Sequence, residues 1–267
     1  MTVDPLDQFK AAQRSGWAHF VPLQMFTTIP AGRLVEHARI RAGMRVLDVA
    51  CGTGVVAITA ARTGAHVTAL DLTPELLREA RANTEIAGVT VEWHEGDVEQ
   101  LPFDANAFDV VLSQFGHIFA PRPEVATREM LRVLKPGGTI AFSTWPPELL
   151  VGRMMRLVSE FLPPPPPGVA PPPLWGDPSV IRERLGTAVR DIVFDRGRLA
   201  APALSLGHYR ETTERTAGPV LKLVESLRGS DPEKLAAFRA AYDALASEYY
   251  DRNTMRQDYL MTRAIKI

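Results

Sequence analysis

The sequence is short of cysteine, of long apolar runs and of net charge, and each shortage excludes a class of protein. Cys51 is the single cysteine among 267 residues, so the chain cannot be held together by internal disulfides. Charged or proline-rich segments interrupt every apolar stretch before it reaches the ~18 residues that suggest a membrane-spanning helix. With 30 basic and 31 acidic residues the formal charge is -1, which leaves no global positive field to hold a nucleic acid.

The start of the chain shows no targeting signal. Residues 1–10, MTVDPLDQFK, lack the basic start and apolar run of a secretory leader. A lone cysteine also suits a reducing compartment. We therefore expect a cytoplasmic protein with no membrane span and no nucleic-acid partner, either a monomer or a homodimer.

From residue 44 onward, short β-branched runs alternate with helical patterns, which is typical of a parallel sheet covered by helices on both faces. With 46% hydrophobic residues the chain can bury one sizeable core. We predict an α/β fold: a doubly wound, mostly parallel seven-stranded sheet with a helical cap. The expected strands are residues 45–49, 66–71, 89–94, 109–113, 139–143, 192–199 and 259–267.

Helix signals lie between these runs. Thr73 is a suitable N-cap and Pro74 a suitable first helical residue. A helix over 123–134 should end at Lys-Pro-Gly-Gly, residues 135–138, because proline and paired glycines cannot continue it. Further helices are expected at 55–62, 149–161, from Pro178, at 218–227 and at 232–250.

The chain divides into four segments by pattern. The proline runs 163–167 and 171–173 predict a stiff polyproline II connector outside the core. We expect an N-terminal helical lid segment (1–43), a ligand-binding core (44–146), a proline-containing cap or insertion (147–188) and C-terminal strands of the same sheet with inserted helices (189–267).

The strongest local signal is a glycine turn, residues 50–54, which joins an apolar strand to the helix expected from residue 55. Glycines let a ligand approach the backbone, and the first strand of a doubly wound sheet ends where such sheets bind nucleotides. The run Gly52-Thr53-Gly54-Val55-Val56-Ala57 also satisfies the dinucleotide pattern, with Asp71 near the ribose distance. Taken alone, the turn leaves a nicotinamide cofactor, another nucleoside or plain strand-to-helix packing open.

Four more motifs follow the turn in order. Together the five stretches resemble the class I S-adenosylmethionine-dependent methyltransferases, especially the branch that includes quinone-biosynthesis and similar small-molecule enzymes. The resemblance covers about residues 44–146, implies a Rossmann-like core, and does not extend beyond Trp145. The matching motifs are VLDVACGTG (46–54), ALDLTPELL (69–77), EGDVEQLPF (95–103), FDVVLSQFG (108–116) and LRVLKPGGTIAFSTW (131–145).

The resemblance implies S-adenosyl-L-methionine as cofactor and S-adenosyl-L-homocysteine as product. Residues 52–54 would approach the methionine portion, and Asp48 would organise its ammonium group. Ser113 and Gln114 would border the point of methyl transfer. Ala50 departs from the family, which most often has glycine there, and we expect only a slight shift of the turn.

The nucleoside half of the cofactor is assigned in the same way. Asp71 would accept both ribose hydroxyls, Leu72 would pack on adenine, Asp97 would accept from the adenine amino group, and the Val98 N–H would donate to a ring nitrogen. The alternatives are a helix-capping Asp48, a turn-forming Asp71 and a solvated Asp97. The expected cofactor-binding set is Asp48, Ala50, Gly52, Gly54, Asp71, Leu72, Asp97, Val98, Ser113 and Gln114.

Methyl transfer from a sulfonium is an in-line displacement. A protein accelerates it by holding the two reacting atoms about 3 Å apart. If the acceptor is a weak acid, a histidine can take its proton, and His117 is our candidate catalytic residue because it follows the strand at 109–113. The alternative is a packing role. We expect an apolar or aromatic small-molecule substrate, with a pocket formed by His117, Trp175, His208 and Tyr209.

The N-terminal segment is the candidate lid. Trp17, Phe20, Met25 and Phe26 form an apolar stretch that either closes over the cofactor or packs on the sheet. In the first case Gln24, Thr27 and Thr28 would reach the methionine carboxylate.

Other functions remain open on sequence grounds. No tyrosine has lysine four residues later, so the short-chain dehydrogenase pair of an NAD(P)-dependent oxidoreductase is missing. Residues 113–116, SQFG, lack the Asn/Asp-Pro-Pro-aromatic motif of methyltransferases that modify adenine or glutamine amino groups in nucleic acid or protein. A cofactor-binding protein without catalysis is a further alternative.

Overall fold

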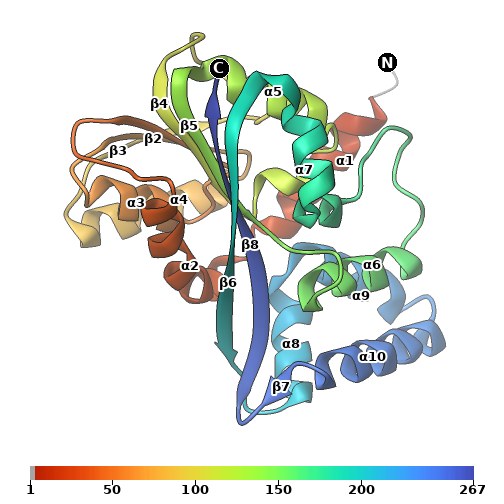
Figure 1. The fold of residues 1–267 in the computed structure, drawn as a ribbon. Helices are drawn as coiled ribbons and strands as arrows, with labels where there is room; N and C mark the ends of the chain where they lie inside the picture. The colour runs from red at the N-terminus through yellow and green to blue at the C-terminus, as the bar shows by residue number, and fades with distance from the viewer. Residues whose placement is uncertain (1–3) are drawn as a thin grey trace.

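The computed structural model describes residues 4–267 and contains one sheet of eight strands in this range (Figure 1). Its strand order is β3-β2-β1-β4-β5-β8-β6, with the short β7 paired to β8. The first five strands are parallel, and β8 lies antiparallel between β5 and β6. The predicted α/β fold with a mostly parallel sheet is confirmed. The strands are β1 Arg45–Val49, β2 His66–Asp71, β3 Val91–Glu95, β4 Phe108–Gln114, β5 Leu134–Thr144, β6 Val189–Pro202, β7 Tyr250–Asp251 and β8 Thr254–Lys266.

The strand order reverses at β1, which lies between β2 and β4. Val46 pairs in register with Val67 on one side and with Val110 on the other. Such a switch point leaves a crevice at the carboxyl ends of the strands, because the two flanking connections leave in opposite directions. The loops that follow β1, β2, β3 and β4 therefore surround one crevice.

Helices cover both faces of the sheet (Figure 1). On one face α2 (Gln24–His37), α3 (Val55–Ala61) and α4 (Pro74–Ala87) bury small and branched side chains against β1, β2 and β4. On the other face α5 (Pro123–Val133) and α7 (Pro178–Leu185) pack on β1, β4, β5 and β8. We call these the α2 face and the α5 face.

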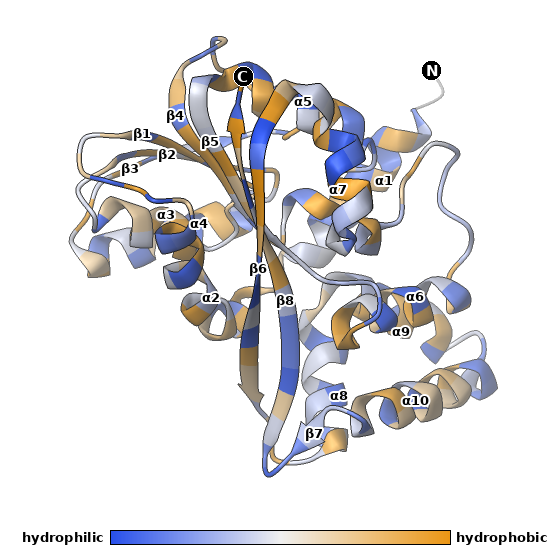
Figure 2. Cartoon of the chain, viewed as in Figure 1, coloured by the Kyte–Doolittle hydropathy of each residue, from blue (hydrophilic) through white to orange (hydrophobic). Residues whose placement is uncertain are grey.

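A third core lies beside the long antiparallel pair β6 and β8, under a helical layer that we define as α6 (Leu150–Phe161), α8 (Leu206–Thr216), α9 (Gly218–Arg228) and α10 (Pro232–Ser247). These helices carry both apolar and polar residues, as Figure 2 shows. The first helix, α1 (Pro5–Trp17), meets α9 backbone to backbone, because a Cβ on Gly16 would lie 3.2 Å from Gly218 Cα. Thus α1 connects the helical layer to the sheet.

Several elements differ from the sequence-based expectation. β5 begins at Leu134 and contains the Pro-Gly-Gly run that we expected to precede it, and β3 begins at Val91 instead of residue 89. Residues 162–171 carry no helix or strand, but the second proline run enters a 3-10 helix, η3 (Pro172–Gly176), whose Trp175 is buried. α8 was not predicted at all. No helix within residues 4–267 is both long enough and apolar enough to cross a membrane.

Candidate functional site

The glycine turn connects β1 to α3 through left-handed backbone. Ala50, Gly52 and Gly54 have φ of 51°, 55° and 82°. A Cβ on Gly54 would lie 2.5 Å from the Trp93 ring, so glycine is required there by space as well as by conformation. The Cys51 N–H donates to the Leu70 carbonyl at 3.1 Å, which ties the turn to β2.

Ala50 adopts the left-handed conformation that glycine accepts without cost and that costs an L-residue about 1 kcal/mol. Its neighbour across the crevice is Gly116, where a Cβ would lie 2.6 Å from Ala50 Cβ and 2.5 Å from its carbonyl oxygen. A glycine at 116 therefore makes the room that alanine at 50 needs. The sequence shows both residues but not that they face each other.

Asp48 is a buried carboxylate without a partner. Its side chain is 1% exposed, and neither oxygen accepts a hydrogen bond from any residue in 4–267. Burial raises its pKa well above the usual value, and the nearby Asp71 charge adds to this rise. An ionised carboxylate in this position is costly unless a cation pairs with it. The ammonium of an amino acid, such as the methionine part of the implied cofactor, fits this requirement.

Asp71 ends β2 and joins the turn to the next helix. Its Oδ2 accepts from the Gly52 N–H and its Oδ1 from the Thr73 N–H, both at 2.8 Å. Burial raises its pKa and these backbone bonds counteract the rise. Each carboxylate oxygen has a second lone pair, so two hydroxyl donors can still be accommodated. Leu72 follows, half-buried.

Asp97 lies after β3 in a charged cluster that the sequence analysis missed. Its Oδ1 accepts from the Glu99 N–H at 2.9 Å, and its Oδ2 is 2.6 Å from Lys10 Nζ of α1. Lys10 also bonds Glu99 Oε2 at 2.6 Å, and Arg122 holds Glu99 with two donors at 2.9 and 2.7 Å. No sequence signal distinguishes Lys10 from other lysines on a polar helix face. The neighbouring Val98 is buried in the apolar core.

α2 lies over Gln114 at the end of β4. Gln114 Nε2 donates to the Thr27 carbonyl at 2.8 Å, while its Oε1 is buried without a partner in the described residues. Asn83 Nδ2 of α4 donates a hydrogen bond to Gln24 Oε1 of α2 at 2.9 Å, which joins the two helices. Of the expected lid residues, Met25 is 71% exposed and does not close over the site. The Thr27 and Thr28 hydroxyls donate to the Gln24 carbonyl instead of pointing at the crevice.

Ser113 and His117 lie on the α5 face. Ser113 Oγ donates to the Val49 carbonyl at 2.8 Å and accepts from the His117 N–H at 3.2 Å. The His117 ring is completely buried between Phe142 and Trp175, with centroid distances of 4.8 and 4.6 Å. Burial lowers its pKa to about 3, and the Arg184 charge acts in the same direction. Such an imidazole is neutral at pH 7 but takes up a proton poorly, so this placement does not support a general base.

The four expected pocket residues form two groups. Trp175 packs against His117, whereas His208 and Tyr209 lie on α8 in the helical layer. His208 is exposed in the first turn of α8, and the Tyr209 hydroxyl accepts from Gln257 Nε2 at 2.8 Å in the third core. Only His117 and Trp175 contact each other beside the crevice.

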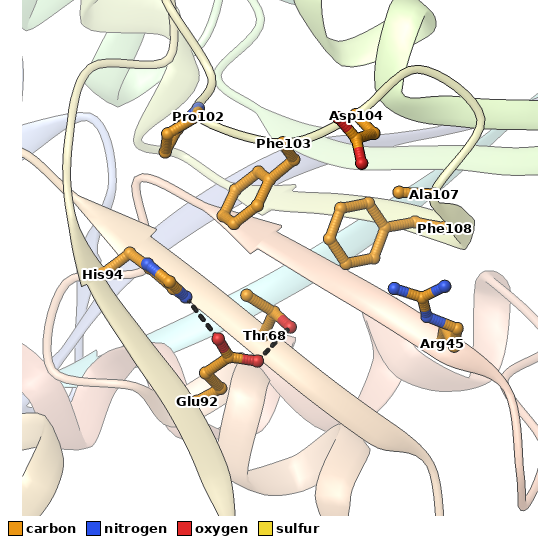
Figure 3. A pocket seen from close by; sticks show the side chains of 9 residues that line it. All are labelled: Arg45, Thr68, Glu92, His94, Pro102, Phe103, Asp104, Ala107 and Phe108. Atoms are coloured by element: carbon orange, nitrogen blue, oxygen red, sulfur yellow. Dashed lines mark hydrogen bonds and ion pairs between the residues drawn. The ribbon is translucent and has the colours of Figure 1, made fainter.

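Two surface hollows lie toward the amino ends of the strands. One of about 340 Å³ is lined by Arg45, Thr68, Glu92 and the loop that carries Phe103, and its two polar contacts both involve Glu92 (Figure 3). The other, about 420 Å³, lies between β2 and β3 at residues 61–67 and 88–92. Neither is lined by Asp48, Asp71 or Asp97.

The chain is similar to known proteins in sequence and in fold. Residues 46–138 match the family model described as a methyltransferase domain. An uncharacterized protein of Mycobacterium tuberculosis is 38% identical over 234 residues, which cover 87% of this chain and 85% of that protein. A ubiquinone biosynthesis O-methyltransferase of Xanthomonas axonopodis is 38% identical over 145 residues, which cover 52% of this chain and 59% of that enzyme. Among solved structures, a Bacillus halodurans protein assigned as a methyltransferase has a TM-score of 0.60 at 22% identity and covers 88% of this chain and 98% of that one, which shows a shared fold.

Proposed function

We propose that this chain, which belongs to the class I S-adenosylmethionine-dependent methyltransferase family, methylates a small molecule and not a nucleic acid or a protein. It is a transferase whose cofactor is S-adenosyl-L-methionine and whose product is S-adenosyl-L-homocysteine. Membership of this family argues against the NAD(P)-dependent oxidoreductase, which the glycine turn alone leaves open.

The burial of the transfer edge is the observation that carries the small-molecule proposal. Ser113, Phe115 and His117 follow one another where methyl transfer is expected, and their side chains are 0%, 7% and 0% exposed. α1 and η3 both contact the 117–119 turn, and α2 covers Gln114. A macromolecular surface could not reach these atoms, whereas a small molecule can be enclosed among them. The net charge of -1 also gives no support to a polyanionic substrate.

Three carboxylates are proposed to bind the cofactor. Asp48 would pair with the ammonium, Asp71 would accept the ribose hydroxyls with its remaining lone pairs, and Asp97 would accept from the adenine amino group. The turn at 50–54 brings backbone close to the methionine portion. Leu72 and Val98 would form the apolar walls of the adenine slot.

The cofactor supplies an electrophilic methyl group when bound, and the protein's part is to position the acceptor in line with it and to exclude water. The residues at this edge would hold the acceptor's O, N or C nucleophile in line with that methyl group. We propose that His117 holds the acceptor by hydrogen bonding and does not take its proton, because its pKa of about 3 is far from the value that suits a general base at neutral pH.

Calorimetry tests this assignment. We expect S-adenosylhomocysteine to bind with micromolar or tighter affinity and NAD not to bind. Asp71→Ala should weaken the former at least about tenfold, because two charge-assisted bonds are lost. Glu92→Ala, in the hollow of Figure 3, is the matched control and should leave binding unchanged. Binding of NAD, or equal affinities of wild type and Asp71→Ala, would contradict the proposal.

A further inference from the structure

A second set of buried polar atoms lacks partners, and it lies on the α5 face, away from Asp48. Both ring nitrogens of His117, Nε1 of Trp175, the hydroxyls of Thr144 and Thr262, and Nη1 of Arg184 accept or donate no hydrogen bond within residues 4–267. The first four side chains are at most 1% exposed. Unpaired buried polar groups are rare in proteins because each costs free energy.

These atoms share one neighbourhood. The His117 and Trp175 rings both contact Phe142. Thr262 pairs directly with Phe142 across β5 and β8, so both side chains leave the sheet on the same face. Thr144 lies two residues after Phe142 on β5 and therefore on that face too. The Arg184 guanidinium of α7 lies over the Trp175 ring at 4.5 Å and completes the set.

Hydrogen-bond donors dominate this neighbourhood. An indole N–H and a guanidinium can only donate, a neutral imidazole donates once and accepts once, and hydroxyls do either. Arg184 has no ion pair with any described residue, and burial lowers its pKa, although the charges of Glu124 and Glu183 act in the opposite direction. The missing partner is therefore rich in lone pairs and negative in charge. The aromatic rings of Phe142 and Trp175 beside these donors suit a planar group.

We propose that His117, Trp175, Thr144, Thr262 and Arg184 form a subsite that binds an oxyanion, a carboxylate or phenolate, of a planar aromatic methyl acceptor. The inference rests on the proposed function, because the subsite adjoins Ser113, which pairs with Phe142 across β4 and β5. The acceptor's nucleophile would then project from the subsite toward the carboxyl ends of β1 and β4. η3, which carries Trp175, is reached through the irregular segment 162–171 (Figure 1), and this segment is the element that could move to admit the acceptor.

Benzoate is the direct probe, since it carries a carboxylate on a planar ring and need not be methylated. We expect calorimetry to show benzoate binding to protein saturated with S-adenosylhomocysteine and at least about tenfold weaker binding of neutral benzyl alcohol. Thr144→Val and Thr262→Val, which each replace one hydroxyl by a methyl group and keep the shape, should weaken benzoate binding at least about threefold. Tyr242→Phe is the matched control, because it removes a buried hydroxyl that is equally without a partner in the third core.

Thermal unfolding gives a second readout that separates a ligand subsite from a network satisfied by buried water. If the polar atoms await a ligand, Thr144→Val and Thr262→Val together should raise Tm of the unliganded protein by about 1–3 °C, because two unsatisfied groups are removed. If water satisfies them, Tm should fall and the proposal is overturned. Absence of benzoate binding, or binding unchanged by Thr144→Val and Thr262→Val, also overturns it. Failure of S-adenosylhomocysteine to bind, measured without benzoate, would refute the proposed function instead.

Discussion

Asp48 brings a carboxylate into the core between β1 and α3, where no described residue donates to either oxygen. The unfolded chain ionises this group above its ordinary pKa, while burial raises the pKa of the folded state well above that value. Between the two pKa values the folded protein holds a proton that the unfolded chain has lost. Stability from this group is therefore lost as the pH rises through that window.

Asp48→Asn should remove this penalty. We expect urea unfolding of the unliganded variant to show greater stability than wild type at pH 8, and the difference should shrink toward pH 4, where both carboxylate and amide are uncharged. The magnitude is set by the pKa shift, at about 1.4 kcal/mol per unit. A variant less stable than wild type at pH 8 would show that the carboxylate is paired in solution.

Ala50 stores strain in the turn, and glycine should release it. The left-handed φ of 51° costs an alanine about 1 kcal/mol, which outweighs the extra freedom that glycine gives the unfolded chain. We expect Ala50→Gly to raise the free energy of unfolding by about 0.5–1 kcal/mol. Ala57→Gly in the adjoining α3, where φ is helical, is the control and should lower it by about 1 kcal/mol. If Ala50→Gly lowered the free energy of unfolding as Ala57→Gly does, Ala50 would not be strained.

At the residue scale, the sequence reveals acids and glycines but not their partners. The order of the motifs predicts that Asp48, Asp71 and Asp97 lie at or just beyond the ends of successive strands, and the structure has them there. Lys10 lies 87 positions from Asp97, and no local pattern reports a contact at that distance. The His117 ring is packed against Trp175, which lies beyond residues 46–138, the stretch that matches the family model.

At the scale of elements, predictions held where burial on both faces dictates the residue pattern. The ranges of β1 and β2 match the sequence prediction, because a doubly covered strand must be continuously apolar. α8, with the sequence LGHYRETTERT, has no clear apolar stripe, and long-range contacts hold it instead: Glu214 pairs with Arg239 of α10 at 2.6 Å. Tertiary packing also decides the conformation of the prolines at 171–173. They enter η3, which their composition alone does not predict.

α1 is held against the sheet by Lys10, whose side chain is 14% exposed while it contacts Asp97 and Glu99. Lys10→Met keeps the length of the side chain but leaves two carboxylates facing each other, and we expect a loss of about 1–3 kcal/mol of stability. Hydrogen exchange should increase throughout α1. Arg14→Met is the control, because its pair with Glu95 is about half exposed on both sides and should contribute less than about 0.5 kcal/mol. Equal effects of the two variants would mean that α1 is held by its apolar contacts alone.

At the scale of the whole molecule, the parallel half of the sheet carries the proposed cofactor edge, and the antiparallel pair β6 and β8 carries the helical layer. α1 contacts both halves, through Lys10 at the 97–99 loop and through Gly16 at α9. Cofactor binding at one edge can therefore affect the stability of the whole chain, because a ligand that binds only the folded state adds its binding free energy to folding.

This linkage predicts how affinity depends on pH. In the proposed site, the ammonium of S-adenosylhomocysteine would pair with Asp48 only when that carboxylate is ionised, and burial raises the pKa of Asp48 in the free protein. Binding then releases a proton, so affinity should rise with pH by up to about tenfold per unit below that pKa, and level off above it. Calorimetry between about pH 5 and 7.5, where an α-amino group stays largely protonated, measures the slope, and the thermal shift caused by the ligand should grow in parallel. In Asp48→Asn both the affinity and its pH dependence should be lost, whereas Asp71→Ala should lower affinity and keep the slope. A wild-type affinity independent of pH would place the ammonium elsewhere in the site.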